Sequence, residues 1–272
     1  MQAPSHIRQT ESLRRLRDRL AGLEPPEKHA RTPLGCRSAD VALKGGLQRG
    51  ALHEVFAEAG HETAATGFAL AMALRFCGGK PLLWVRQDFS ALEHGVLAAT
   101  GLIEFGLDPA RILVLRVADA VDAVRAAGDA LSCTALGSVV IEAFGEPKVF
   151  TLATSRRLTL TASEHGVSAI LLRFGAELEA SAAETRWLVR AARSQGYDEA
   201  WGNPVFETDL ARNRHGSTGH WVMEWSCDDG LFRESCKKRA ADSGAVVSAP
   251  SDRPVATAME IARGFRTFPS DN

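Results

Sequence analysis

Four short, unbroken apolar runs, separated by segments of helical length, constrain the fold of this chain more than any other feature of its sequence. The runs read LLWV, ILVL, SVVI and AILL. Runs of this kind are typical of strands that are covered on both faces of a sheet. Strands joined by helices predict a right-handed, mostly parallel α/β sheet. We expect strands at 52–56, 81–85, 112–116, 138–143 and 167–174, and helices at 64–76, 91–99, 120–130 and near 150–164.

After residue 174 the alternation of strands and helices gives way to strands alone. Strands are expected at 187–192, 205–212 and 220–225, and the last two flank the turn sequence NRHGSTG. Two strands joined by a short turn that contains glycine are typical of a hairpin. The predicted fold class is therefore α/β, with a helix-covered, mostly parallel sheet and a C-terminal β-hairpin extension.

Two segments flank the predicted core, which spans residues 31–235. Residues 1–30 are interpreted as an amphipathic helix and a linker, because apolar residues recur at three- and four-residue steps before Pro25 and Pro26. This helix packs either on its own domain or on a neighbouring protomer or partner. Residues 236–272 are rich in Ala, Ser, Asp, Arg and Pro with little periodicity, which predicts a largely disordered tail.

The composition excludes several classes of protein. The net charge is -1, so only a local basic patch would attract nucleic acid. The five cysteines form no CxxC pair and the eight histidines show no HxxxH or HExxH spacing, so we expect no disulfide framework and no metal site. No apolar run approaches the ~20 residues of a membrane span. We therefore expect a cytoplasmic protein.

The segment between Gly50 and Leu74 has the layout of a phosphate-binding P-loop, with a strand, a loop of small residues and an alanine-rich helix. A working P-loop has the pattern GxxxxGK[ST], in which the Lys reaches the phosphates and the hydroxyl binds magnesium. Residues 57–66 contain no Lys or Arg and carry Glu58 and Glu62. Because a carboxylate repels a phosphate, we expect no nucleotide cofactor.

The order of these segments from residue 31 to about 225 resembles the ATPase core of RecA. The matching stretches are TPLGCRSADVALKGGLQRGALHEVF before and within the first core strand, and SVVIEAF in the Walker B position. Within that superfamily the chain resembles the ImuA family, through the phrases GLQRGALHEVFAE, AATGFALA and ARNRHGSTGHWVMEW. The resemblance implies an accessory protein of SOS-induced, error-prone translesion synthesis, without established catalysis. It also implies two partners, an inactive Y-family polymerase homologue called ImuB and an error-prone replicative-type polymerase.

Laid on the RecA loop without gaps, the chain has lost the residues that bind nucleotide. Ala57 and Glu62 replace the glycines, Thr63 replaces the lysine, and Ala64 replaces the magnesium-binding hydroxyl. A gapped alignment brings Thr63 or Thr66 near the metal position, but no alignment recovers a lysine. Glu142 stands in the Walker B position, where we favour a solvated or helix-capping carboxylate over a metal ligand. The vestigial loop also includes Gly60.

Three polar residues, Glu93, His94 and Arg173, are expected near the carboxyl edge of the sheet, where we interpret them as an ordinary polar rim. The segments that correspond to the DNA-gripping loops of a recombinase are reduced to GEPKVF and to the acidic FGAELEASAAETR, which contains Glu177, Glu179 and Glu184. DNA affinity rests mainly on Lys and Arg. Strand exchange is therefore not expected.

Two regions are candidates for contacts with partners. The hairpin contains Arg212, Arg214, His215 and His220, with Trp221 and Trp225 nearby. Basic residues beside aromatic ones suit single-stranded nucleic acid, although strand alternation would bury one of the tryptophans, and a protein partner is favoured. In the tail, Lys237 and Lys238 precede an apolar stripe of Met259, Ile261, Ala262 and Phe265. This stripe either folds on a partner or is a frayed end.

The sequence thus predicts a non-catalytic RecA-fold adaptor, without catalytic residues, cofactor or metal, that acts through contacts with ImuB and the error-prone polymerase. Direct contact with DNA is expected to be indirect or weak, and self-association is left open. One alternative is a divergent NTPase, in which Thr63 or Thr66 and Glu142 serve magnesium and a neighbouring subunit supplies an arginine. The other is a regulator that binds RecA filaments through the shared fold.

Overall fold

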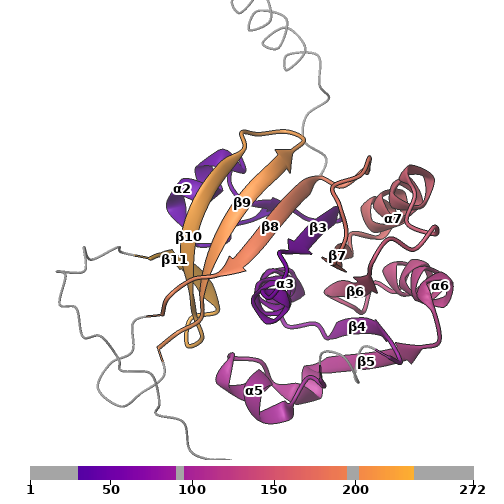
Figure 1. Cartoon of the computed structure of the whole chain (residues 1–272), viewed down its shortest axis with the longest axis horizontal. Helices are drawn as coiled ribbons and strands as arrows, with labels where there is room; N and C mark the ends of the chain where they lie inside the picture. The colour runs from indigo at the N-terminus through magenta and orange to yellow at the C-terminus, as the bar shows by residue number, and fades with distance from the viewer. Residues whose placement is uncertain (1–29, 90–94, 195–201, 236–272) are drawn as a thin grey trace, which may run out of the picture. The chain divides into compact units, whose positions relative to one another are not determined.

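The computed structural model describes residues 30–89, 95–194 and 202–235. These residues belong to one compact unit that extends to Ser235 (Figure 1). The helical elements are α2 (Arg37–Ala42), α3 (Glu62–Cys77), α5 (Ala99–Glu104), the 3₁₀ turn η1 (Pro109–Arg111), α6 (Ala120–Leu131) and α7 (Leu152–His165). The strands are β1 (Arg31–Thr32), β2 (Leu47–Gln48), β3 (Leu52–Ala57), β4 (Leu82–Gln87), β5 (Ile112–Val117), β6 (Ser138–Phe144), β7 (Ser168–Phe174), β8 (Thr185–Ala191), β9 (Val205–Asn213), β10 (Gly219–Ser226) and β11 (Leu231–Glu234).

The main sheet has nine strands in the order β11-β10-β9-β8-β3-β7-β6-β4-β5. All neighbours from β8 to β5 are parallel, whereas β9, β10 and β11 add to β8 in antiparallel fashion. Strands β1 and β2 form a separate antiparallel pair. The predicted mostly parallel α/β sheet and its C-terminal hairpin are therefore confirmed.

Successive residues of the central strands pack into two different cores. On β6, Val140 joins the cluster built around α3, whereas its neighbours Val139 and Ile141 join the cluster that α6 and α7 cover. Because side chains alternate across a strand, an unbroken apolar run supplies both clusters at once. The helices lie on opposite faces accordingly, with α3 on one and α6 and α7 on the other (Figure 1).

Helix α3 is the central helix of the larger core. Its aromatic residue Phe68 is fully buried and contacts rings of three strands: Trp187 on β8, Phe206 on β9 and Phe232 on β11. The helix ends at Cys77, and its C-cap Gly78 has a φ of 50°, a left-handed conformation that glycine adopts without steric cost. Helix α3 therefore packs against strands of both the parallel part and the antiparallel part of the sheet.

A buried hydrogen-bond chain crosses the seam between β3 and β8. The Nε1–H of Trp187 donates to Oγ1 of Thr185 (2.9 Å), and that hydroxyl lies 2.7 Å from Nδ1 of His53. The other ring nitrogen of His53 lies 2.9 Å from the carbonyl oxygen of Gln48. Since a carbonyl oxygen only accepts, the neutral ring donates from Nε2 and accepts the Thr185 hydroxyl proton at Nδ1.

The hairpin of β9 and β10 is docked on the core. Its register pairs Trp221 with Thr208, and Trp225 on the same strand is fully buried. The side-chain amide of Asn213 donates to the carbonyl of Ala42 at the end of α2 (3.0 Å), and the backbone N–H of Ser217 donates to the same oxygen (3.2 Å). The turn is therefore fixed to α2 at its tip.

Two sequence predictions about local structure are wrong. A helix was expected at 91–99, but residues 95–98 are not helical and α5 begins at Ala99, while 90–94 lie outside the described residues. The run ILVL was expected to be covered on both faces. It forms β5 at the edge of the sheet, where Leu113, Val114 and Leu115 are 52%, 46% and 39% exposed, because β4 is its neighbour on one side only.

The elements not foreseen from the sequence include α2, the β1–β2 pair, the 3₁₀ turn η1 and β11. The predicted segments at 1–29 and 236–272 lie outside the described residues, so their proposed organisation stays a prediction.

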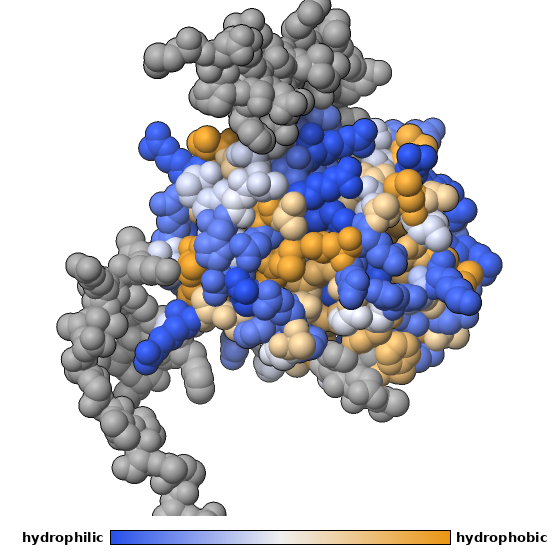
Figure 2. All heavy atoms as spheres, turned by 45° about the horizontal axis from the view of Figure 1, so that its top comes forward, coloured by the Kyte–Doolittle hydropathy of each residue, from blue (hydrophilic) through white to orange (hydrophobic). Residues whose placement is uncertain are grey.

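On the face shown in Figure 2, an apolar band lies among hydrophilic side chains.

Replacing Asp119 by alanine is expected to lower the free energy of unfolding by about 1 kcal/mol. Asp119 is the N-cap of α6, and its carboxylate accepts from the N–H groups of Val121 (2.8 Å) and Asp122 (2.9 Å). Urea denaturation of Asp119→Ala and of the cap-preserving Asp119→Ser measures the difference. Equal losses in both variants would show that capping is not what Asp119 contributes.

Candidate functional site: a vestigial phosphate-binding loop

The loop that would bind phosphate in a P-loop protein lies between β3 and α3, at the carboxyl edge of the parallel strands. β3 ends at Ala57 and α3 begins at Glu62, so the loop comprises residues 58–61. Sheets of this type hold their ligands at this edge. Thr63, which stands in the lysine position, lies in the first turn of α3 with an exposed side chain. The position that should supply a cation thus presents a neutral hydroxyl.

Hydrogen bonds within the chain occupy the polar groups of this loop. The N–H of Gly60 donates to Oε1 of Glu62 (3.2 Å), and the N–H of His61 donates to the carbonyl of Glu58 (2.9 Å). The Thr66 hydroxyl donates back to the carbonyl of Glu62 (2.9 Å). A helix N-terminus ordinarily attracts an anion, and here the side-chain carboxylate of Glu62 is already present. A phosphate would have to compete with that carboxylate.

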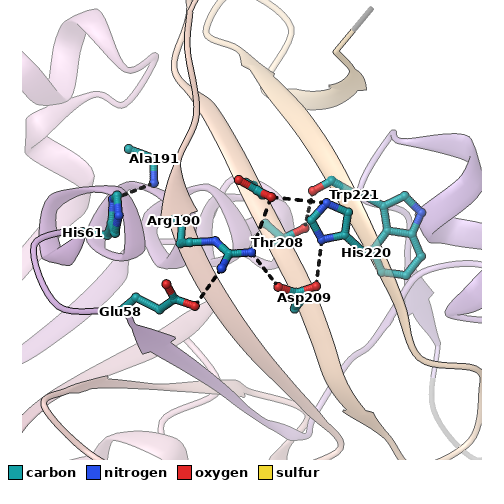
Figure 3. Close-up of polar contacts among 9 residues, drawn as sticks. Glu58, His61, Arg190, Ala191, Thr208, Asp209, His220 and Trp221 are labelled. Atoms are coloured by element: carbon teal, nitrogen blue, oxygen red, sulfur yellow. Dashed lines mark hydrogen bonds and ion pairs between the residues drawn. The ribbon is translucent and has the colours of Figure 1, made fainter. Parts of the chain in front are cut away.

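A network of charged side chains connects the loop to β8, β9 and β10 (Figure 3). Nη1 of Arg190 lies 3.0 Å from Glu58, and Nη2 lies 3.4 Å from Glu207 and 3.0 Å from Asp209. His220 contacts the same two strand carboxylates, with Nδ1 2.7 Å from Asp209 and Nε2 3.5 Å from Glu207. These groups are about a third to a half exposed, so each pair contributes at most about 1 kcal/mol. Arg190 is surrounded by carboxylates.

A second contact fastens the loop on the same side. The backbone N–H of Ala191 donates to Nδ1 of His61 (3.2 Å), as Figure 3 shows beside the Arg190 network. Both contacts come from β8, which lies next to β3 in the sheet. The side chains of Glu58 and His61 therefore hold the loop against β8. Sequence analysis did not single out Arg190, because its partner Glu58 is 132 positions away.

Glu142, in the Walker B position, is buried and paired. It is 3% exposed, its Oε1 lies 3.1 Å from Nη2 of Arg86, and its Oε2 accepts from Nε1 of Trp84 at 2.8 Å. The interpretation of Glu142 as solvated or helix-capping is therefore wrong, because Arg86 on β4 supplies a buried countercharge. The Nε–H of Arg86 has no acceptor among the described residues.

A second buried ion pair lies on β3 and β8. Glu54 accepts from Nε of Arg186 (2.6 Å) and from the hydroxyl of Ser181 (2.6 Å), and both charged side chains are almost fully buried. Breaking such a pair by removing one partner is strongly destabilising. This pair is part of the sheet interior.

Arg173 was interpreted as part of a polar rim, and this is wrong. It is 4% exposed, and its guanidinium lies over the rings of Phe56 (5.8 Å) and Phe150 (5.2 Å). Burial lowers the pKa of Arg173 from its ordinary value, and the nearby carboxylate of Glu54 opposes that shift. In the segment before β8, Glu177 and Glu179 are exposed as expected of an acidic loop, whereas Glu184 is only 4% exposed.

The basic residues of the hairpin do not form one cluster. Nη1 of Arg212 donates to the carbonyl of Ser181 (2.8 Å), and Nε2 of His215 lies 3.6 Å from Oε2 of Glu184. Arg214 is exposed. His220 lies in the Arg190 network instead of beside these arginines.

Trp221 is partly buried and packs against Trp187 at 6.0 Å between ring centroids. Glu93, His94, Lys237, Lys238 and Phe265 lie outside the described residues. Their proposed contacts stay predictions.

Within the described ranges, no group of three or more His, Cys, Asp or Glu residues is arranged to hold a metal ion. The four cysteines of those ranges, Cys36, Cys77, Cys133 and Cys227, are free thiols. None of the described helices is both long and apolar enough to span a bilayer.

Comparison of the sequence with known proteins finds ImuA. The chain is 28% identical over 197 residues to Protein ImuA from two strains of Caulobacter vibrioides, NA1000 / CB15N and ATCC 19089 / CIP 103742 / CB 15. The match covers 66% of this chain and 77% of the relative. No family model matches the sequence.

Comparison of the structure finds a recombinase fold. The RadB recombinase superposes with a TM-score of 0.52 and 16% sequence identity, over 74% of this chain and 98% of the other. At that identity the likeness concerns the fold alone. The sequence match to ImuA and the RecA-type fold together support the predicted resemblance to the ImuA family of RecA-like proteins.

Proposed function

We propose that this chain is an ImuA-family accessory protein of damage-induced, error-prone DNA synthesis that works through protein contacts and without nucleotide hydrolysis. The observation that carries the proposal is the state of the vestigial loop. Glu62 accepts a hydrogen bond from the loop N–H of Gly60, and uncharged Thr63 stands in the lysine position. A loop of this kind offers phosphates a carboxylate in place of a cation.

The buried pair of Arg86 and Glu142 supports the same proposal. A Walker B carboxylate acts by holding a hydrated magnesium ion or orienting a water. Glu142 already bonds to Nη2 of Arg86 (3.1 Å) and Nε1 of Trp84 (2.8 Å). A metal ion would have to replace both partners and would leave the Arg86 guanidinium buried without its countercharge, which is costly. The divergent-NTPase alternative therefore has little support in the site.

The partners of the proposal follow from the family resemblance: an ImuB-like Y-family polymerase homologue and an error-prone replicative-type polymerase. The fold supplies a rigid platform, because both faces of the sheet are packed by helices. We place the protein in the cytoplasm, where the four free thiols of the described residues would stay reduced.

Calorimetric titration of the full-length protein with the ImuB homologue from the same organism tests this function. We expect 1:1 binding whose affinity is the same with and without Mg-ATP, because the contacts do not depend on a nucleotide. RecA filaments on single-stranded DNA form the second arm. Binding to RecA alone, or binding to ImuB that requires ATP, would contradict the adaptor account and favour the filament regulator or the NTPase.

A further inference from the structure

A groove of about 360 Å³ lies between α6 and α7, on the face of the sheet opposite α3 (Figure 1). Its walls are mostly apolar: Val121 and Val124 come from α6, Val149 from the loop before α7, and Ala153 from the first turn of α7. Val121 is 50% exposed, so this wall is open to solvent. The volume lies near the lower end of the range for ligand clefts, roughly 300–1,000 Å³. The groove therefore has room for a few side chains of a partner.

The charged residues that line the groove are both arginines, Arg125 and Arg157. Nη1 of Arg125 lies 3.0 Å from Asp122, but this pair is exposed and contributes little. Arg157 makes no hydrogen bond and no ion pair with any residue in the described ranges. Its Nη2 would lie 3.8 Å from a Cβ built on Gly128, so the guanidinium reaches from α7 across to α6. The groove thus presents one guanidinium without a countercharge.

The surroundings of Arg157 favour a carboxylate that is flanked by apolar side chains. Helical spacing places Ala153 one turn before Arg157 and Leu160 one turn after it on the same face of α7, and Leu160 is 69% exposed. Arg156 and Lys148 are also exposed and make no ion pair within the described residues. These cations attract an anion, and the apolar residues are covered only if the anion belongs to an amphipathic segment.

Single-stranded nucleic acid suits this groove less well than an acidic peptide does. Nucleic acid is held by a positively charged groove together with aromatic side chains on which its bases stack. The side chains that line this groove are aliphatic, hydroxyl-bearing or guanidinium groups, and none is aromatic. Valine and alanine walls between two helices instead match the apolar face of an incoming helix.

We propose that the α6–α7 groove is the docking site for a segment of the polymerase homologue that carries an aspartate or glutamate between bulky apolar side chains. The inference rests on the proposed function, since it names the surface through which the adaptor holds its partner. Arg157 pairs with the carboxylate, and the valines of α6 and the loop before α7 cover the apolar side chains. This surface lies on the face of the sheet away from α3, so docking there does not involve the vestigial loop.

Two exposed helical arginines provide a matched test. Arg157 lines the groove, whereas Arg37 of α2 is also exposed and unpaired within the described residues, and α2 packs near β10 and β11 instead. Calorimetric titration with the ImuB homologue is expected to show at least a ~10-fold loss of affinity for Arg157→Glu, equivalent to about 1.4 kcal/mol. Arg37→Glu should bind like the wild type. Arg157→Lys should keep most of the affinity, because it keeps the charge.

A second variant tests the opposite wall of the groove. Val121→Glu places a carboxylate on α6 and removes apolar surface, so it should also lose at least ~10-fold in affinity. Both positions are exposed, so the folded state should be little affected. Thermal denaturation checks this for each variant.

Competition by overlapping short peptides that tile the ImuB homologue identifies the segment. The strongest competitor should carry Asp or Glu between bulky apolar residues, and changing that acid to lysine should restore binding to Arg157→Glu. If the wild type binds the homologue and Arg157→Glu binds equally well, the groove inference is overturned and the proposed function stands. A competitor without an acid would also overturn it, as would an oligothymidine that displaces the homologue from the wild type but not from Arg157→Glu. If the wild type does not bind the homologue, both proposals are overturned.

Discussion

Replacing Glu142 by alanine is expected to lower the free energy of unfolding by about 3–5 kcal/mol, because it leaves a buried guanidinium without its countercharge. Arg86 is 5% exposed, and Glu142 also accepts the Nε1–H of Trp84. The substitution therefore removes the acceptor of two buried donors at once. Chemical denaturation at neutral pH measures the loss.

Two further variants separate this explanation from others. Glu142→Gln keeps an acceptor for Trp84 but removes the charge, so its loss of stability should be smaller than that of alanine. Glu104→Ala removes an exposed glutamate of α5 and should change stability by at most about 0.5 kcal/mol. If Glu142→Ala were as stable as the wild type, Glu142 would not be a structural residue, and a role in metal binding would regain support.

The second large effect is a loss of stability in acid that depends on His53. Burial lowers the pKa of His53 from 6.5 to about 4, and its bond to the Gln48 carbonyl only partly opposes that shift. The folded state therefore favours the neutral ring. Its contribution is fully present above pH 6.5, the unfolded value, and is lost as the pH falls towards 4. The expected loss over that interval is about 3 kcal/mol.

Comparison with His53→Gln isolates this linkage from the other groups that titrate in acid. The variant cannot be protonated at this position, although it is expected to be less stable than the wild type at pH 7. Free energies of unfolding from urea titrations between pH 7 and 4 should converge for the two proteins by about 3 kcal/mol. Parallel curves would mean that His53 does not resist protonation in the fold.

The parallel sheet could be predicted because each of its strands is marked by a short apolar run in the sequence. Runs such as SVVI occupy both faces of a strand, and the alternation in HWVMEW follows a strand that buries Trp225. The position of a strand within the sheet is a different matter. The run ILVL resembles that of a central strand, but β5 lies at the edge of the sheet and has a neighbour on one side only. The residues of β5 themselves do not indicate this edge position.

The absence of the P-loop lysine is visible in the sequence, whereas the partners of the remaining polar residues could not be predicted from it. The missing lysine is visible at Thr63, and the bond from Gly60 to Glu62 spans two positions, so it lies within reach of local reasoning. Glu142 and Arg86 are separated by 56 positions, and Glu54 and Arg186 by 132. Only the folded sheet brings these pairs together, because parallel strands align residues far apart in the chain.

Thermal denaturation of the purified protein with and without millimolar Mg-ATP or Mg-ADP, alongside a hydrolysis assay, tests the central claim most directly. A ligand that binds only the folded state stabilises it by RT ln(1 + [L]/Kd), about 1.4 kcal/mol at a concentration tenfold above Kd. A RecA protein with an intact P-loop serves as the positive control. The account predicts no shift in Tm and no turnover. A clear shift with either nucleotide would contradict it and make the protein a nucleotide-dependent switch.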